Sequence, residues 1–426
     1  MSALRAATRE TFRSFHIRNF RLFFGGQLIS QIGNWLTLIA QTLLVLKLTD
    51  SGIALGALAA AQFGPVLLLG SWAGLVADRS DKRKLLLIVQ TIAMAQSFAL
   101  AALAFTGHPP VLAIYAVAIV GGITIAFDNP ARRAFVVEMV PEDDMQNAVS
   151  LNSALMTGSR VVGPVIAGLL VVNVGFGWCF LVDAFSYVAV LAGLWLMRSE
   201  ELRPAPVTRK GKGQIRDGLR YARSVPELWV PLVMMAAVGT LSYNFQTVFP
   251  LFNERDLHGS TTTYTWLFAV VSVGALIGAL RVARRHTTSI RSVALSSLGY
   301  GAAMTVMAFA PNRWIAYAVG LFLGVTSIAF LTSSTAIVQM RSAPEMRGRV
   351  LALQAMLFLG STPIGGPIVG WIAQQFGARY AIGVGAVAAF GAGVWGLAKV
   401  RHATVEDAPD TGIVEADIAA VDVAAT

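Results

Sequence analysis

The sequence predicts an all-α integral membrane protein built from two six-helix halves. Of its 426 residues, 55% are hydrophobic and 13% are charged, and the mean hydropathy is +0.64. So few charges could not cover a soluble surface of this size. The apolar residues also gather into about twelve stretches, each close to the ~20 residues that a bilayer crossing requires.

These stretches define the expected order of elements along the chain. The first six spans are predicted at 20–46, 53–76, 85–106, 111–137, 148–172 and 178–197, and the second six at 228–252, 264–283, 292–310, 314–338, 350–374 and 380–398. The expected domains are an N-terminal segment 1–19, a bundle 20–197, a basic linker 198–227, a bundle 228–398 and a disordered tail 399–426. The linker is expected to contain a short surface helix at 215–224.

The Lys and Arg residues predict the orientation of the chain. Loops that we place outside hold only four of the 33, namely Lys47, Arg255, Arg313 and Arg379, and nearly all the others lie in the termini, the linker and the loops on the other side. Cation-rich loops stay in the cytoplasm. We therefore expect a multi-pass protein of a bacterial inner membrane with both termini cytoplasmic. Its cations form no single patch for nucleic acid.

The two halves resemble each other in sequence. Before the fifth span, Glu138-Met139 precedes a Gly-rich stretch that contains Gly163-Pro164. Before the eleventh, Gln339-Met340 precedes one that contains Gly366-Pro367. The two blocks occupy the same place in each set of six. This predicts parallel repeats that face each other across a central cavity.

The loop between the second and third spans carries the clearest motif, Gly74-x-x-x-Asp78-Arg79-x-x-Lys82-Arg83. It resembles the signature loop of the major facilitator superfamily of secondary transporters, except that Asp81 stands where that family usually has Gly. Segments 48–52, 77–79 and 160–164 look most like the branch that contains the enterobactin exporter and bacterial drug exporters. The resemblance implies a twelve-helix fold and transport by alternating access.

The same resemblance implies a role for the loop. In the family the basic residues of this motif pair with an acid at the end of the fourth span, and the matching acid here is Glu138. Lys82 or Arg83 with Glu138 is therefore our expected conformational latch, together with Gly74, Asp78 and Arg79. A solvated pair that contributes little energy is the alternative.

Glycines in the fifth span predict close helix contacts. Gly158, Gly163 and Gly168 remove side-chain bulk, and Pro164 weakens one turn of backbone hydrogen bonding. The family calls this stretch an antiporter motif. Close packing without any part in transport is the alternative interpretation.

Ionisable residues inside the spans are few and costly in hydrocarbon. Asp128, Arg160 and Asp183 are the candidates, with Arg160 taken as the only cation deep in any span. We expect Asp183 to neutralise Arg160 and Asp128 to remain as the group that exchanges protons. A purely structural tie between Arg160 and one of the acids is the alternative.

The expected substrate cavity is rich in aromatic residues and has few polar groups, which suits a bulky amphipathic solute. Its candidate lining residues, each of which could instead face lipid or pack in the core, are Gln31, Asn34, Trp35, Tyr187, Tyr243, Asn244 and Gln246.

Other classes of protein fit poorly. Cys179 is the only cysteine and the five His lack metal-site spacing, so we expect no metal and no cofactor. No catalytic constellation and no Gly-x4-Gly-Lys-Ser/Thr loop are present, which argues against an enzyme and a primary pump. We predict a secondary transporter that exports a drug-like compound or a siderophore, in exchange for protons. An importer of a small metabolite and a transport-incompetent receptor or scaffold stay open, as does the oligomeric state, for which a monomer is the default.

Overall fold

The computed structural model describes residues 11–203, 214–284 and 288–406, and nearly all of them are helical. The elements of the first half are η1 (Arg13–His16), α2 (Arg18–Thr49), α3 (Gly52–Arg79), α4 (Lys82–Phe105), α5 (Val111–Glu138), α6 (Glu142–Val174), α7 (Phe176–Trp195) and η2 (Ser199–Glu201). Those of the second half are α8 (Gln214–Ser224), α9 (Pro226–Leu241), α10 (Phe245–Leu251), η3 (Phe252–Asp256), α11 (Thr261–Ala283), α12 (Ile290–Ala308), α13 (Arg313–Arg341), α14 (Pro344–Leu359), α15 (Thr362–Gln375) and α16 (Ala378–Glu406).

Local sequence explains where several helices begin. The side chains of Ser51, Ser260 and Asn312 accept hydrogen bonds from backbone N–H groups in the first turns of α3, α11 and α13. Such caps satisfy donors that a helix start leaves without a partner. Asp81 does the same for α4, accepting from Lys84 N–H at 3.1 Å. This cap gives a local reason for an Asp at the position where the resembling family has Gly.

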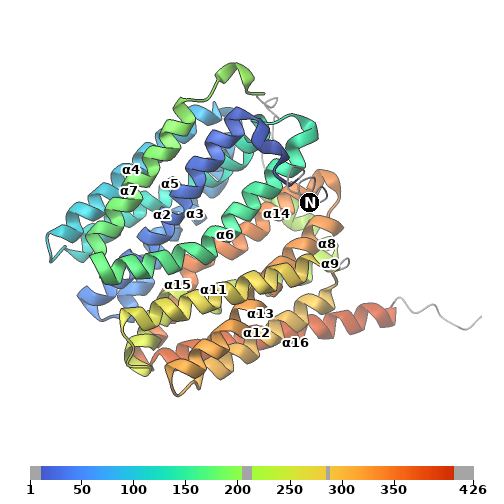
Figure 1. The fold of residues 1–426 in the computed structure, drawn as a ribbon. Coiled ribbons are helices and arrows are strands. Elements are labelled where there is room, and N and C mark those ends of the chain that lie inside the picture. The colour runs from blue at the N-terminus through green and yellow to red at the C-terminus, as the bar shows by residue number, and fades with distance from the viewer. Residues whose placement is uncertain (1–10, 204–213, 285–287, 407–426) are drawn as a thin grey trace, which may run out of the picture.

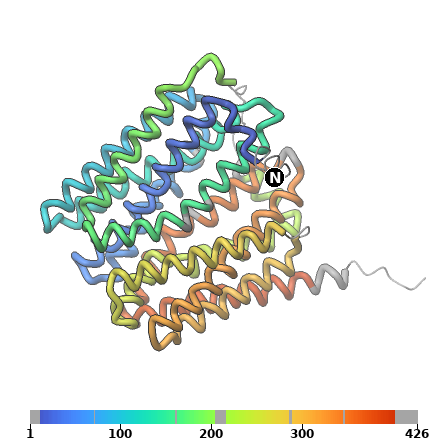
Figure 2. Tube along the Cα trace, viewed as in Figure 1, coloured from blue at the N-terminus to red at the C-terminus, as the bar shows by residue number. Residues whose placement is uncertain are grey.

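The helices pack in two groups, seen in Figures 1 and 2 as the blue-to-green helices α2–α7 and the yellow-to-red helices α9–α16. Within the first group, α2 packs on α6 and α7, and α3 on α5. Within the second, α11 packs on α13, and α12 on α13 and α16. The main contacts between the groups join α3 to α15 and α6 to α11.

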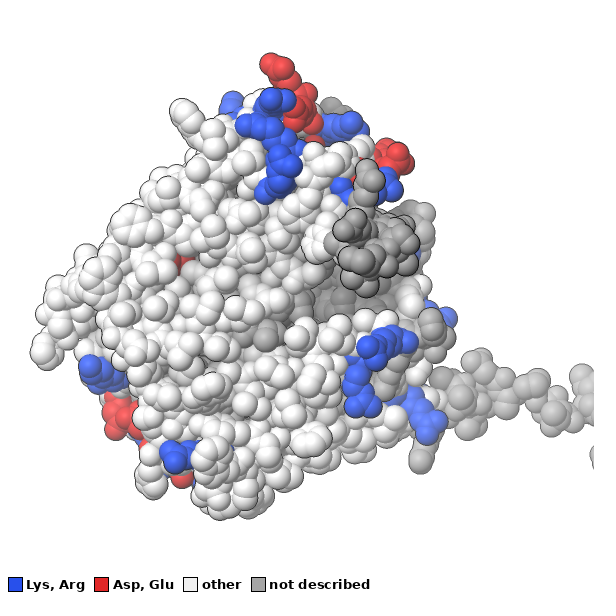
Figure 3. Space-filling view, in the orientation of Figure 1, with Lys and Arg blue, Asp and Glu red and all other residues white. Residues whose placement is uncertain are grey.

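The surface has the character of a membrane protein. In the described residues, ten helical segments are long and apolar enough to cross a bilayer. Helices α6 and α12 are not among these ten. The apolar part of α6 is the shorter segment Val162–Val174. Figure 3 shows charged side chains gathered at the two ends of the molecule, with a broad, nearly uncharged band between them.

The helices run between two ends of the molecule, which we call the linker end and the far end. The linker end holds η1, α8 and the start of α14, and the far end holds the turns that follow α2 and η3 (Figure 1).

Most predicted spans match observed helices, and three details differ. The eleventh span is two helices, α14 and α15, that meet at Gly360–Ser361, and the seventh is divided into α9, α10 and the π-helical η3. Residues 399–406 continue α16, so the prediction of a disordered tail from 399 is wrong for that stretch. The surface helix expected in the linker is present as α8, whereas residues 204–213 and 407–426 lie outside the described part of the chain.

Candidate functional site

A cavity of about 220 Å³ lies inside the first group of helices, between α2, α3, α4, α5, α6 and α7. Four predicted lining residues border it: Gln31, Asn34, Trp35 and Tyr187. Asp128 and Asp183 border it too, and its other strongly polar lining residues are Gln41, Gln62, Gln90, Gln96, Asn129 and Arg132. The wall is therefore much more polar than the sequence led us to expect.

Asp128 and Arg132 form a buried ion pair on one face of α5. Arg132 Nη2 lies 2.5 Å from Asp128 Oδ2, and Arg132 Nη1 donates to Gln27 Oε1 at 3.0 Å. Gln90 donates to the other carboxylate oxygen of Asp128 at 2.7 Å. Arg132 is only 6% exposed, so this pair supplies the charge neutralisation that burial requires.

Two predictions about these charges are wrong. Arg160 was expected to be the only cation deep in a span, but Arg132 is buried within α5, and Asp128 is paired instead of free. Whether Arg160 meets Asp183 lies outside the described side chains. The signal for the missed pair was present in the sequence, since residues four apart on a helix are neighbours.

Asp183 on α7 is surrounded by hydroxyl groups instead. It is 1% exposed, and its Oδ2 accepts hydrogen bonds from Thr37 Oγ1 at 2.6 Å and Ser97 Oγ at 2.7 Å. The Ser186 hydroxyl lies 3.4 Å from Oδ1. Among the described side chains, no cation forms a salt bridge with this carboxylate. Hydroxyl donors from three helices therefore surround an acid that lines the same cavity as the Asp128–Arg132 pair.

Gly33 on α2 makes room for this acid. A Cβ added at Gly33 would collide with Asp183 Oδ1 and Ser186 Oγ, whereas one added at Gly25 of the same helix would meet nothing within 4 Å. Beside them, the Tyr187 hydroxyl donates to Asn34 Oδ1 at 2.7 Å. The lack of a side chain at Gly33 thus lets α2 lie directly against the carboxylate.

The glycine motif in α6 is only partly a contact surface. A Cβ at Gly163 would collide with the Trp35 side chain of α2, and one at Gly168 with Thr265 of α11 in the other group. A Cβ at Gly158 would meet nothing within 4 Å, so the predicted close contact is wrong there. Pro164 lies within the uninterrupted helix α6.

The predicted cavity residues of the second half do not join those of the first. Tyr243, Asn244 and Gln246 are absent from the lining of the cavity. The Tyr243 hydroxyl donates to the backbone oxygen of Ser327, and the Asn244 amide donates to that of Thr240 at 2.7 Å. In this structure, two of these polar groups support the helices of the second group.

The signature loop holds the expected ion pair at the linker end. Lys82 Nζ lies 2.7 Å from Glu138 Oε1, and the two side chains are only 9% and 6% exposed. Arg83 instead donates to the backbone oxygens of Leu194 and Trp195 at the end of α7. Lys82 is therefore the residue that meets Glu138.

The other motif residues, Gly74, Asp78 and Arg79, lie in the last two turns of α3, just before the loop that leads to Lys82. Asp78 lies half-buried in the last turn of α3, and Arg79 is exposed beside it. Gly74 makes no close helix contact, because an added Cβ there would meet nothing within 4 Å. The start of α14 follows at the same end, and α14 packs against α3.

At the far end, the two groups are held together closely. The backbone of Gly52 touches Gly370, and a Cβ at Gly56 would collide with the backbone of Gly366. Arg255, between α10 and α11, lies 3.1 Å from the Asp50 carboxylate at the end of α2. At the linker end, an added Cβ at Gly70 or Gly74 of the same helix α3 would meet nothing. Helix α3 therefore contacts the second group tightly near its beginning and loosely near its end.

Comparison with known proteins agrees with this architecture. The chain is 26% identical to the staphyloferrin A transporter of Staphylococcus aureus over 84% of this chain and 90% of the relative. It is 24% identical to macrolide efflux protein A of Streptococcus pyogenes, covering 85% and 91%. It is also 24% identical to the enterobactin exporter EntS of Escherichia coli, covering 82% and 84%.

A solved structure has the same fold. A bacterial homologue of the lysosomal transporter Spinster, in an inward-facing and occupied conformation, superposes with a TM-score of 0.68 at 16% identity and covers 92% of this chain and 97% of that one. Residues 9–421 match the family described as transmembrane secretion effector. The chain is therefore a multi-pass membrane protein of the major facilitator fold that belongs to the transmembrane secretion effector family.

Proposed function

We propose that this protein exports an amphipathic small molecule, of the drug or siderophore kind, by alternating access in exchange for protons. The observation that carries the proposal is the polar cavity of the first group, which holds one paired and one hydroxyl-bound carboxylate. The names of the relatives, a staphyloferrin A transporter, a macrolide efflux protein and an enterobactin exporter, support this class of solute.

Asp183 is the proton carrier in this proposal. An ionised carboxylate buried without a cation is costly, and a proton removes that cost. The Thr37 and Ser97 hydroxyls can serve both states, because a hydroxyl donates to a carboxylate and accepts from a carboxylic acid. Asp128 already has Arg132 as its partner, so losing its charge would leave a buried cation behind.

The cavity also supports recognition of polar groups on the solute. Five glutamine side chains line it, and amides both donate and accept hydrogen bonds. Trp35 and Phe63 add apolar surface. A solute with an apolar body and several hydroxyl, carbonyl or carboxylate groups fits such a wall.

The two groups of helices are the moving parts in this proposal. Gly52 and Gly56 hold the far end closed against α15, while Lys82 and Glu138 tie the linker end within the first group. Interfaces of this kind have two discrete arrangements, which lets the groups rock around the cavity.

The test is transport by purified protein in liposomes, with erythromycin and enterobactin as probe solutes. Wild-type protein should accumulate at least one probe in response to a pH gradient, with proton movement in the opposite direction. Asp183→Asn should still bind the probe but lose the response to the gradient by roughly tenfold or more, since the carrier can no longer titrate.

Asp143→Asn is the matched control, because the same substitution falls on an exposed acid outside the cavity. Its transport should equal that of the wild type. If Asp183→Asn still transports the probe in response to the pH gradient, Asp183 is not part of the coupling step. If the wild type accumulates the probe equally with and without the gradient, proton exchange is ruled out.

We further propose that the linker end faces the cytoplasm of a bacterial cell, because the cation-rich loops lie there. Cysteines introduced singly at His108, Asn312 and Lys212, in a Cys179→Ser background, report the orientation. A membrane-impermeant thiol reagent applied to intact cells should label the first two positions and leave Lys212→Cys unlabelled. The reverse pattern would invert the orientation.

A further inference from the structure

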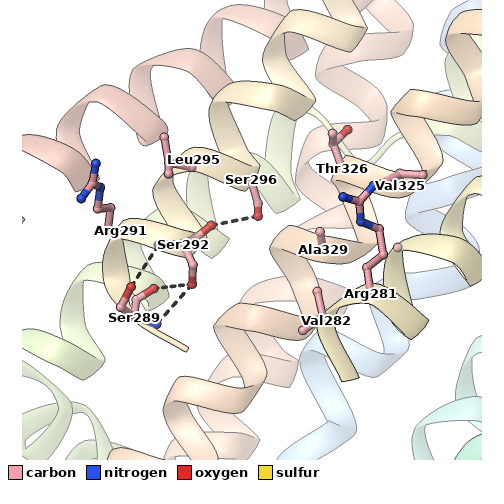
Figure 4. A pocket seen from close by; sticks show the side chains of 11 residues that line it. Arg281, Val282, Ser289, Arg291, Ser292, Leu295, Ser296, Val325, Thr326 and Ala329 are labelled. Atoms are coloured by element: carbon pink, nitrogen blue, oxygen red, sulfur yellow. Dashed lines mark hydrogen bonds between the residues drawn. The ribbon is translucent and has the colours of Figure 1, made fainter. Parts of the chain in front are cut away.

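A second concave site lies on the second group, away from the cavity. It is a groove of about 380 Å³ at the linker end, formed by the end of α11, the start of α12 and the middle of α13. Figure 4 shows Arg291 and the hydroxyls of Ser289, Ser292 and Ser296 along one wall, and Arg281 on the other. Proton exchange through Asp183 uses none of these residues.

The two arginines of the groove lie in a stretch of the chain without acids. The chain has no Asp or Glu between Asp256 and Glu345, and neither Arg281 nor Arg291 has a salt-bridge partner among the described residues. The loop between them adds Arg284, Arg285 and His286 to the local sequence.

The equivalent loop of the first half is different. There Lys82 pairs with Glu138, and Lys84 lies 3.9 Å from Asp81. Sorting of positive loops to one side of the membrane would act on both loops alike. This sorting does not explain why the second-half loop lacks acids while the first-half loop has them.

The remaining walls of the groove are apolar. Leu295 is 51% exposed, and Val325 and Ala329 are half-buried beside it on α13. The base is closed, because the backbones of α11 and α13 touch where Gly278 meets Val325. A cationic rim above an apolar slot matches a molecule with a charged head and a hydrocarbon chain.

Hydrogen-bond donors are available beside the cations. Ser289 caps α12, its Oγ accepting from Ser292 N–H at 3.3 Å, and its own O–H has no acceptor among the described residues. The first turn of α12 adds the favourable end of a helix dipole for an anion.

We propose that this groove binds an anionic phospholipid of the leaflet at the linker end, with the headgroup at the cationic rim that Arg281 and Arg291 form and one acyl chain along Leu295 and Ala329. Its charge complementarity selects an anionic headgroup, and its position within the apolar flank selects a lipid over a soluble anion. The site thus couples the second group of helices to the composition of the membrane.

The test is native mass spectrometry of the full-length protein in detergent, with dioleoylphosphatidylglycerol or dioleoylphosphatidylcholine added. Wild-type protein should retain one molecule of the anionic lipid preferentially. The double variant Arg281→Gln/Arg291→Gln should bind it roughly thirtyfold more weakly, as expected for the loss of two cations near a membrane surface. Arg313→Gln/Lys399→Gln removes the same charge from exposed positions outside the groove and should bind normally.

A third variant tests the apolar slot without changing any charge. Ala329→Phe should also lose the lipid, because its ring fills the place of the acyl chain. Equal binding of the two lipids by the wild type, or equal loss in both double variants, would overturn the site. Displacement of the lipid by millimolar inorganic phosphate, or full retention in Ala329→Phe, would show a binder of free anions and also overturn it. A melting temperature close to that of the wild type confirms that each variant is folded.

Discussion

The interiors of the two groups of helices differ in polarity. The first group buries Asp128, Arg132 and Asp183 around a cavity. The corresponding region of the second group is filled by aromatic rings, with Tyr243 lying 5.1 Å from Phe358 and 5.4 Å from Tyr300 between ring centres. Two tyrosine hydroxyls of the second group donate to backbone oxygens, that of Tyr243 to Ser327 and that of Tyr300 to Ser242 at 2.8 Å.

This difference separates two roles that a symmetric repeat could have shared. Asp128, Asp183 and Arg132 lie in the first group, where they border the cavity. The second group presents packed rings, which are stiff and carry no charge. In the proposed mechanism, only the first group changes its charge state, and the second provides a rigid surface against which it moves.

The largest expected effect that tests this contrast comes from Asp128→Asn. It leaves Arg132 buried without a counter-ion, which costs about 3–5 kcal/mol. Folded protein recovered after size-exclusion chromatography should fall sharply, and Asp128→Asn/Arg132→Gln should restore most of it by removing both charges. A single variant as stable as the wild type would show that the pair contributes little.

A smaller effect distinguishes the linker ends of the two groups. Glu138→Gln breaks a pair that is almost fully buried, and should lower stability by about 3 kcal/mol and slow transport. The ion pair compared with it joins the linker to the second group: Asp217 of α8 lies 3.6 Å from Arg349 of α14, with both side chains substantially exposed. Asp217→Asn should change stability by less than about 1 kcal/mol. Similar melting temperatures for the two variants would contradict the asymmetry.

The smallest effect concerns the packing around Asp183. Gly33→Ala should cost about 1–3 kcal/mol, because the new methyl group collides with Asp183 and Ser186. Gly25→Ala on the same helix meets open space and should be neutral or slightly stabilising, since Ala favours a helix over Gly. Thermal unfolding in detergent compares the two. Equal melting temperatures would mean that α2 can move away from the carboxylate without loss.

Much of the architecture could be predicted from local patterns. Apolar stretches near the length of a bilayer crossing located most of the helices, and Pro and charge in residues 198–227 indicated a linker with a short helix. The pairing of a loop lysine with Glu138 followed from the resemblance of its motif. The tail was expected to begin at 399, but residues 399–406 continue the helix that precedes them.

The sequence by itself determined which residues lie in the apolar spans, because hydropathy is a property of each local stretch of chain. It also contained the Asp128–Arg132 pair, four residues apart on one helix. Only the tertiary structure decided that Thr37, Ser97 and Ser186 surround Asp183, and that Tyr243 supports the second group instead of lining the cavity. Those partners come from helices far apart in the chain, and their meeting depends on how whole helices pack, which no local pattern encodes.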